Sequence, residues 1–158
     1  MASGGAAGSA AGIGLPIGRY APPLRLVALD GSAIDLASLR GRPVWIDFLA
    51  SWAPACQDEL PLVEKYHAEL GQRVAIILVD VRESQATAAA FENRMKLDLP
   101  VGLDLNGAAQ HAWAAYSLPI HYWIDAFGVV RASGYGGLSS SQMLDGLHQV
   151  LPAASASP

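Results

Sequence analysis

The chain has 158 residues, of which 52% are hydrophobic and 15% charged, and its formal net charge is −4. This length and composition predict one globular domain that buries roughly two-thirds of its unfolded surface. No basic patch interleaves with aromatic residues, which argues against nucleic acid or an anionic membrane surface as a partner. No apolar run reaches the roughly 18 residues that a membrane span requires.

The two ends of the chain differ from the middle in composition. Residues 1–18 are rich in Ala, Gly and Ser, and residues 1–14 lack the basic start and leucine-rich centre of a secretory signal. We expect a disordered linker, or a cloning remnant in place of a removed anchor, over residues 1–18. One domain is then expected over residues 19–151, with a disordered tail over residues 152–158.

The first part of this domain contains two short alternating segments around Asp30 and Gly31, a pattern typical of a hairpin. Residues 37–40 predict a single helical turn. Residues 44–49 are apolar apart from Asp47, which favours a strand buried on both faces, as in a parallel sheet.

A helix is expected next, with its apolar stripe made by Leu60, Val63, His67 and Leu70. Residues 74–79 form a second unbroken apolar run. A strand–helix–strand unit of this length predicts a right-handed parallel crossover.

In the second half of the chain, Ser84 is expected to cap a helix that ends near Met95. Residues 99–104 predict a short strand and turn. Asn106 is expected to cap a further helix, on which one face carries Ala109, Ala112, Trp113 and Tyr116.

Residues 120–125 and 129–132 predict a terminal antiparallel hairpin. The last helix is expected to be capped by Ser139 or Ser140. Its inward-facing residues are predicted to be Leu144, Leu147, Val150 and Leu151.

Residues 44–61 read Val-Trp-Ile-Asp-Phe-Leu-Ala-Ser-Trp-Ala-Pro-Ala-Cys-Gln-Asp-Glu-Leu-Pro, which is an apolar strand, a sharp turn and the start of a helix. The helix carries Cys56, the only cysteine in the chain. A single cysteine excludes an internal disulfide and a thiolate metal cluster.

This stretch resembles the active site of thioredoxin-like proteins of the TlpA/ResA kind. Their turn is Trp-Cys-x-x-Cys, with a glutamate three residues and a proline five residues after the second cysteine. The residues that match are Trp52, Pro54, Cys56, Glu59 and Pro61, and Ala53 stands in place of the first cysteine. The segment before the strand resembles the family's lead-in, so the resemblance covers about residues 20–151.

The resemblance implies an α/β thioredoxin-like fold: a central mixed sheet flanked by helices, with an N-terminal hairpin and the central insertion of the TlpA/ResA kind. It implies a thiol–disulfide oxidoreductase that reduces or isomerises protein disulfides, with cytochrome or metal-site maturation among the family's tasks. No cofactor is expected.

A dithiol oxidoreductase uses one cysteine at a helix N-terminus, where the backbone N–H groups and the helix dipole lower the thiol pKa. A second cysteine one turn deeper resolves the mixed disulfide. The exposed position is predicted at Ala53 and the deeper one at Cys56, so the attacking group is missing. We interpret Cys56 as a buried, inert thiol, with direct catalysis as the alternative.

Asp47 lies within an apolar strand, where a carboxylate is costly. In thioredoxins, an aspartate at the matching place accepts the proton of the resolving cysteine, whereas many TlpA-like relatives carry another polar residue there; the resemblance to thioredoxins implies a general base with a raised pKa. The alternative is a carboxyl that only bonds buried backbone or water. Glu59 has the family's acidic position on the helix, where it either tunes the thiol or is a solvated carboxylate.

Pro119 matches the family's cis-proline, which leaves the backbone of Leu118 free to hold extended polypeptide. Trp52 is expected to be exposed beside the turn. The expected substrate-binding residues are therefore Trp52, Pro54, Leu118 and Pro119.

The four histidines show no ligand-pair spacing with the cysteine, and we expect core or surface roles for His67, His111, His121 and His148. No metal site is expected.

Three functions remain open. The parent is a thiol–disulfide oxidoreductase in which Ala53 replaces the nucleophilic cysteine, by engineering or otherwise. Alternatively, the chain is a non-catalytic module that binds extended polypeptide or a redox partner. A peroxidase of the peroxiredoxin kind would need a proline seven residues before the cysteine and a threonine or serine three before it; Leu49 and Ala53 stand there, so both requirements fail.

Family habit implies an extracytoplasmic location, in the periplasm or on the outer face of a membrane, with the anchor or signal absent from this chain. The expected partners are protein dithiol or disulfide substrates or a membrane electron donor. The chain is expected to be a monomer without membrane contact of its own.

Overall fold

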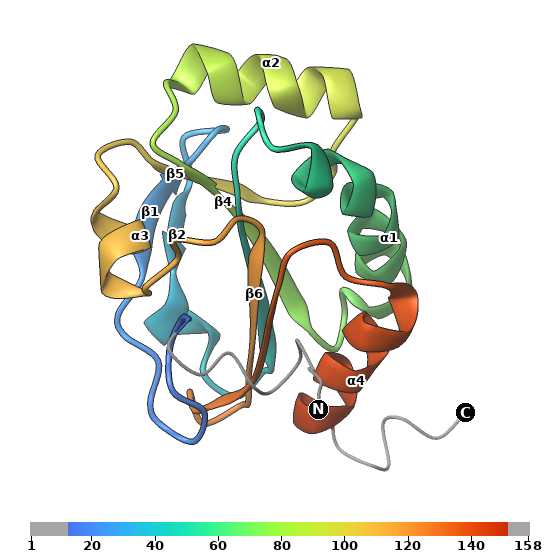
Figure 1. Ribbon diagram of the computed structural model, residues 1–158. Coiled ribbons are helices and arrows are strands. Elements are labelled where there is room, and N and C mark those ends of the chain that lie inside the picture. The colour runs from blue at the N-terminus through green and yellow to red at the C-terminus, as the bar shows by residue number, and fades with distance from the viewer. Residues whose placement is uncertain (1–12, 152–158) are drawn as a thin grey trace.

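The computed structural model describes residues 13–151 (Figure 1), so most of the expected linker and the expected tail lie outside the described residues. The strands are β1 (Arg25–Ala28), β2 (Ala33–Asp35), β3 (Val44–Leu49), β4 (Ala75–Val81), β5 (Val101–Asp104), β6 (Ile120–Ile124) and β7 (Val130–Tyr135). The helices are α1 (Pro54–Leu70), α2 (Gln85–Met95), α3 (Ala108–Ala112) and α4 (Ser140–Val150), with a 3₁₀ turn η1 (Leu36–Leu39).

The strands form one seven-stranded mixed sheet in the order β2-β1-β5-β4-β3-β6-β7. The expected parallel crossover is confirmed, because β3 and β4 pair in parallel and α1 connects them. The two expected hairpins, β1–β2 and β6–β7, are antiparallel. The inserted segment of α2 and β5 adds a further parallel strand beside β4.

The central strands are buried on both faces because they feed two separate apolar cores. In β3 all six residues are buried. Trp45 and Leu49 enter the core beneath α1 and α4, whereas Ile46 and Phe48 enter the core on the side of α3. Figure 1 shows α1 and α4 together on one side of the sheet, α3 on the other and α2 across one end. Strand alternation therefore decides which residues can meet α1.

The helix α3 differs from its prediction in both its start and its length. It begins at Ala108, and the carboxylate of Asp104 accepts hydrogen bonds from the backbone N–H groups of Ala109 and Gln110, at 2.9 and 2.8 Å. Asn106 accepts only one such bond, from Ala108. Because the helix ends at Ala112, the predicted shared face is wrong: Trp113 is buried and Tyr116 is exposed.

The helix α4 starts as predicted, with Ser139 and Gln142 forming a capping box. Its inward face is made by Met143, Leu147 and Val150, and the predicted inward position of Leu144 is wrong, since its side chain is 39% exposed. The helix can approach the sheet closely because it carries Gly146 where the ring of Trp123 lies.

Residues 13–18, which we expected within the linker, make contacts with the sheet. The backbone N–H of Leu15 donates to the hydroxyl of Tyr122 at 3.0 Å, and that of Gly18 donates to the carbonyl of Val130 at 2.8 Å. Among the described residues, no helix is both long enough and apolar enough to cross a membrane.

We predict that Gly146→Ala destabilises the domain. A Cβ atom there would overlap the Trp123 ring, so α4 must move or the ring must tilt. Such overpacking costs about 1–3 kcal/mol. Urea unfolding measures the loss, and Asp145→Ala at the adjacent exposed position serves as the control, with a change within about 0.5 kcal/mol. Equal stability of the two variants would contradict this packing.

Candidate active site

The turn between β3 and α1 places residue 53 at the N-terminus of the helix. Ala53 is the N-cap of α1 and Pro54 follows in its first turn. The backbone N–H of Cys56 donates to the carbonyl of Ala53 at 3.0 Å. The two positions of the family's cysteine pair therefore lie one helical turn apart.

Both of these positions are buried. Cys56 is 1% exposed, in line with its predicted place deeper in the helix. The predicted exposure of Ala53 is wrong, because its side chain is 5% exposed and packs in the same apolar cluster as Cys56.

Polar contacts hold the residues that precede the helix. Glu83, which follows β4, accepts hydrogen bonds from the backbone N–H and the hydroxyl of Ser51, at 2.8 and 2.6 Å. The side-chain amide of Gln57 donates to the carbonyl of Ser51 at 2.8 Å. The turn is thus tied both to the adjacent loop and to its own helix.

The proline loop lies at the same end of β3. The Leu118–Pro119 peptide bond is cis, as predicted. Ile120 pairs with Phe48, so Pro119 comes next to the end of β3, and Leu118 packs against the cluster that contains Cys56. Trp52 is 69% exposed, as predicted, and Pro54 is exposed as well.

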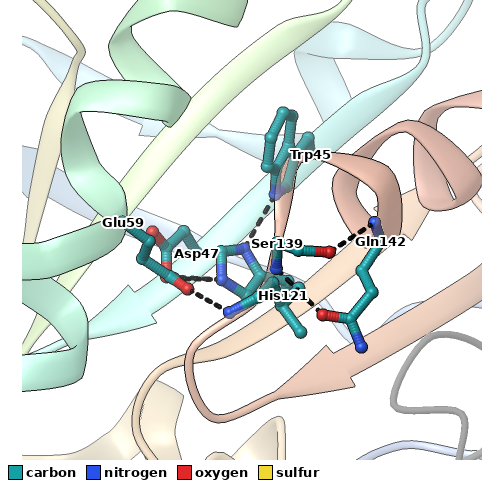
Figure 2. A network of polar contacts seen from close by, with 7 residues as sticks. Trp45, Asp47, Glu59, His121, Ser139 and Gln142 are labelled. Carbon is teal, nitrogen blue, oxygen red and sulfur yellow. Dashed lines mark hydrogen bonds and ion pairs between the residues drawn. The ribbon is translucent and has the colours of Figure 1, made fainter.

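A buried polar network lies beneath this turn, on the α1 side of the sheet (Figure 2). Asp47 and His121 stand directly opposite each other in the β3–β6 pair. His121 Nε2 is hydrogen bonded to Glu59 Oε1 and lies 3.8 Å from Asp47 Oδ1. On the other side of the ring, the indole N–H of Trp45 donates to Nδ1 at 3.0 Å.

These contacts correct two of our interpretations. Glu59 is not a solvated helix carboxylate: it is 3% exposed, and its Oε2 accepts the backbone N–H of Leu138 at 2.9 Å. His121 is fully buried, but it does more than fill the core, since it connects Glu59 with Trp45. The sequence feature that could have indicated this role is the presence of a titratable residue within an apolar strand, as for Asp47.

The environment of the Cys56 thiol lowers its reactivity. Burial raises its pKa to about 12; a hydrogen bond with the Ala50 backbone lowers it, and the charges of Asp47, Glu59 and Asp80 raise it further. Because the thiolate is the reactive form, this environment supports an inert thiol.

Two carboxyls near the thiol have raised pKa values. Burial raises the pKa of Asp47 to about 7, with His121 lowering it and Glu59 raising it. Its Oδ1 has no hydrogen-bond partner in the described part of the chain. Burial and the neighbouring Glu83 raise the pKa of Asp80 to about 8. Such groups can take up or release a proton near neutral pH.

The chemistry of the network does not suit a metal ion. Asp47, Glu59 and His121 offer ligand atoms that lie within 4.8 Å of one another. A metal on Nε2 would require the ring proton on Nδ1. That nitrogen faces the indole N–H of Trp45, which can only donate. The three groups are therefore arranged to hold protons.

The chain has a mixed sheet with helices on both faces, and a buried thiol in the first turn of α1 lies beside a cis-proline. These features define a thioredoxin-like fold of the thiol–disulfide oxidoreductase kind. The sequence model of the AhpC/TSA family matches residues 17–133, and the chain belongs to this family. The expected fold class is thereby confirmed.

Known proteins of this kind resemble the chain along most of its length. The thiol–disulfide oxidoreductase ResA of Bacillus thuringiensis is 26% identical, over 87% of this chain and 80% of its own. A thiol:disulfide interchange protein from Chlorobium tepidum matches in fold with a TM-score of 0.75, at 22% identity, over 85% of this chain and 97% of its own. The exposed lipoprotein thioredoxin Etrx1 of Streptococcus pneumoniae gives a TM-score of 0.70 at 26% identity, over 82% and 100%.

We predict that Cys56 reacts slowly with Ellman's reagent in the folded protein. The rise of its pKa from 9.0 to about 12 lowers the thiolate fraction near neutral pH. Three pKa units correspond to a roughly thousandfold lower thiolate fraction, and burial adds a further barrier to the reagent. Stopped-flow labelling with and without denaturant measures the ratio. Rapid labelling of the native chain would reveal an open thiol and contradict the buried site.

We predict that the free energy of unfolding falls as the pH rises from about 4 to about 8. The folded state keeps the Asp80 proton up to a pKa of about 8, whereas the unfolded chain loses it above 3.8. The unfolded state then binds fewer protons in this window, so stability declines. Urea unfolding across the window should give a shallower decline for Asp80→Asn. The exposed control Asp98→Asn should keep the original slope, and a common slope for all three proteins would refute the assignment.

Proposed function

We propose that this chain is a thiol–disulfide oxidoreductase domain whose nucleophilic position is occupied by Ala53, which leaves it redox-impaired. The observation that carries the proposal is the place of Ala53: it is the N-cap of α1, one turn before a buried thiol and beside the cis-proline loop.

The start of α1 suits a thiolate at position 53. No side chain caps this end of the helix. The free backbone N–H groups and the helix dipole would therefore stabilise negative charge on a sulfur atom placed there. A cysteine at this position would ionise more readily than Cys56, whose burial raises its pKa.

The proposed reaction assigns the first step to position 53, at the start of α1, and the second to Cys56, which lies deeper in the helix. A thiolate at position 53 attacks a substrate disulfide, forms a mixed disulfide and releases the first substrate thiolate. Cys56 then attacks the sulfur at position 53, which closes the internal disulfide and releases the second thiolate. Asp47 is the general base that accepts the Cys56 proton, and Glu59 tunes the charge around the thiol.

The substrate is proposed to bind in extended form across the turn and the proline loop. Trp52 and Pro54 are exposed beside the cis peptide bond of Leu118 and Pro119. An exposed aromatic ring and a free strand-like backbone are common means of holding polypeptide. The proposed partners are protein dithiols or disulfides and a membrane electron donor, with the chain acting as a monomer.

We also propose an extracytoplasmic location. Support comes from a similar protein, Etrx1, which is described as an exposed lipoprotein. Protein disulfides, the proposed substrates, form and persist mainly in oxidising extracytoplasmic compartments.

We predict that Ala53→Cys creates disulfide reductase activity in the insulin assay, whereas the present chain stays at the background rate. Restoring the nucleophile should raise the rate by at least about 100-fold. Ala53→Ser is the matched control, because it adds a side-chain atom of similar placement without a thiol. Mild oxidation of Ala53→Cys should also remove both free thiols.

If Ala53→Cys forms the internal disulfide yet remains inactive on insulin and on other protein disulfides, the oxidoreductase proposal fails. Binding of unfolded polypeptide by the unaltered chain, lost on Trp52→Ala, would then favour the non-catalytic module.

A further inference from the structure

The two ring nitrogens of His121 face different kinds of partner. Nδ1 lies 3.0 Å from the indole N–H of Trp45, and Nε2 is bonded to Glu59 (Figure 2). An indole N–H is a donor only, so Nδ1 must be the acceptor. In a neutral imidazole the proton then lies on Nε2 and is donated to Glu59.

This pattern distinguishes the two buried carboxyls. Glu59 receives hydrogen bonds at both oxygens, from His121 and from the backbone of Leu138. Both oxygens of Glu59 are therefore satisfied by hydrogen-bond donors. Asp47 has an oxygen without such a donor in the described chain. When two nearby carboxyls share one proton, it resides on the one whose charge is less well solvated, which here is Asp47.

A competing effect favours a charged ring. Burial lowers the pKa of His121, but the attraction of Asp47 and Glu59 and the bond to Glu59 together raise it above its usual value. Charging would, however, put a second N–H on Nδ1, pointing at the N–H of Trp45. Two donors in contact in a dry interior leave both without an acceptor, which is costly.

We propose that Trp45 is a positioning residue of the thiol site: its indole N–H holds His121 in the neutral Nε2–H form and so leaves Asp47 as the carboxyl that carries the exchangeable proton. The inference rests on the proposed function, since Asp47, once it has lost this proton, is the base that accepts the proton of Cys56.

The surroundings of the network are apolar apart from a few groups. Apart from His121 itself, the titratable side chains near Asp47 and the Cys56 thiol are Glu59 on α1 and Asp80 on β4. Glu59 acts on both groups, and Asp80 acts on the thiol. Tyr66 of α1 contacts the Trp45 ring, with centroids 5.9 Å apart. These groups bring no positive charge near the ring, so burial and the Trp45 contact are the features that oppose its protonation.

Removing the indole N–H should move one proton within the network. Nδ1 becomes free to take a proton, and Asp47 is the group that releases it. The ring then becomes an imidazolium between two carboxylates, and Asp47 loses its ability to accept a proton near neutral pH.

We predict this outcome for Trp45→Phe, with Trp123→Phe as the matched control. Trp123 is equally buried and stacks on the same ring, with centroids 5.7 Å apart and an angle of 15°. Its indole nitrogen has no hydrogen-bond partner among the described residues, so this control removes an indole without changing the donor to Nδ1.

Nitrogen-15 NMR of His121 and carbon-13 NMR of the Asp47 carboxyl read the two sites directly. In the unaltered chain and in Trp123→Phe, Nε2 alone should carry a proton between about pH 5 and 8. Asp47 should titrate at a pKa of about 7. In Trp45→Phe both nitrogens should be protonated, and the Asp47 midpoint should fall by at least about one unit.

The unaltered chain already tests the first half, whatever the variants do to folding. A doubly protonated ring there, or identical spectra of the two tryptophan variants, would overturn the inference. These readings need no cysteine at position 53. A failure of the proposed function would instead appear in the insulin assay of Ala53→Cys, with the NMR result unaffected.

Discussion

The antiparallel pairing of β3 with β6 is the constraint on which the candidate site depends. The register of this pair brings Asp47 opposite His121. It also places the cis-proline at the end of β3, next to the N-terminus of α1. A shift of β6 by one residue would turn His121 to the other face of the sheet and away from Glu59. In the observed register both polar side chains lie on the face of the sheet that α1 covers, where Glu59 meets His121.

The cost of this arrangement is visible in the interior. Asp47, Asp80, Glu59 and His121 are all nearly inaccessible to solvent, and several of their polar atoms lack a hydrogen-bond partner in the described chain. A purely structural core would be more stable with apolar residues of similar shape at these places. Under the proposed function these groups have a task that a purely structural core would not give them, because they surround a thiol that takes part in disulfide exchange once a cysteine stands at position 53.

Much of the fold could be predicted from local patterns. The buried strands β3 and β4, the Ser84 and Ser139 caps and the two hairpins all follow from periodicity and turn residues. The start of α3 was missed because its capping carboxylate, Asp104, comes from the strand before it and reaches past Asn106. Leu144 was misplaced because a short helix with several apolar residues permits more than one inward face.

For the site, the resemblance supplied the positions but not their environments. Glu59 looks like a surface residue when only its helix is considered, and it is buried because α4 and the segment before it close over it. His121 could be connected to Asp47 only through the β3–β6 register, which joins residues 74 positions apart. The hydrogen bond from Trp45 to His121 depends in turn on the orientation of the indole ring, which cannot be predicted from the pattern of residue types.

The raised pKa values of Asp47, about 7, and Asp80, about 8, also alter the electrical character of the whole molecule. The isoelectric point of 5.4 that follows from composition treats both carboxyls as ordinary surface acids. In the folded chain both remain neutral at that pH. The native protein should therefore focus at a higher pH than its unfolded form, and it reaches neutral solution with less negative charge than its sequence suggests.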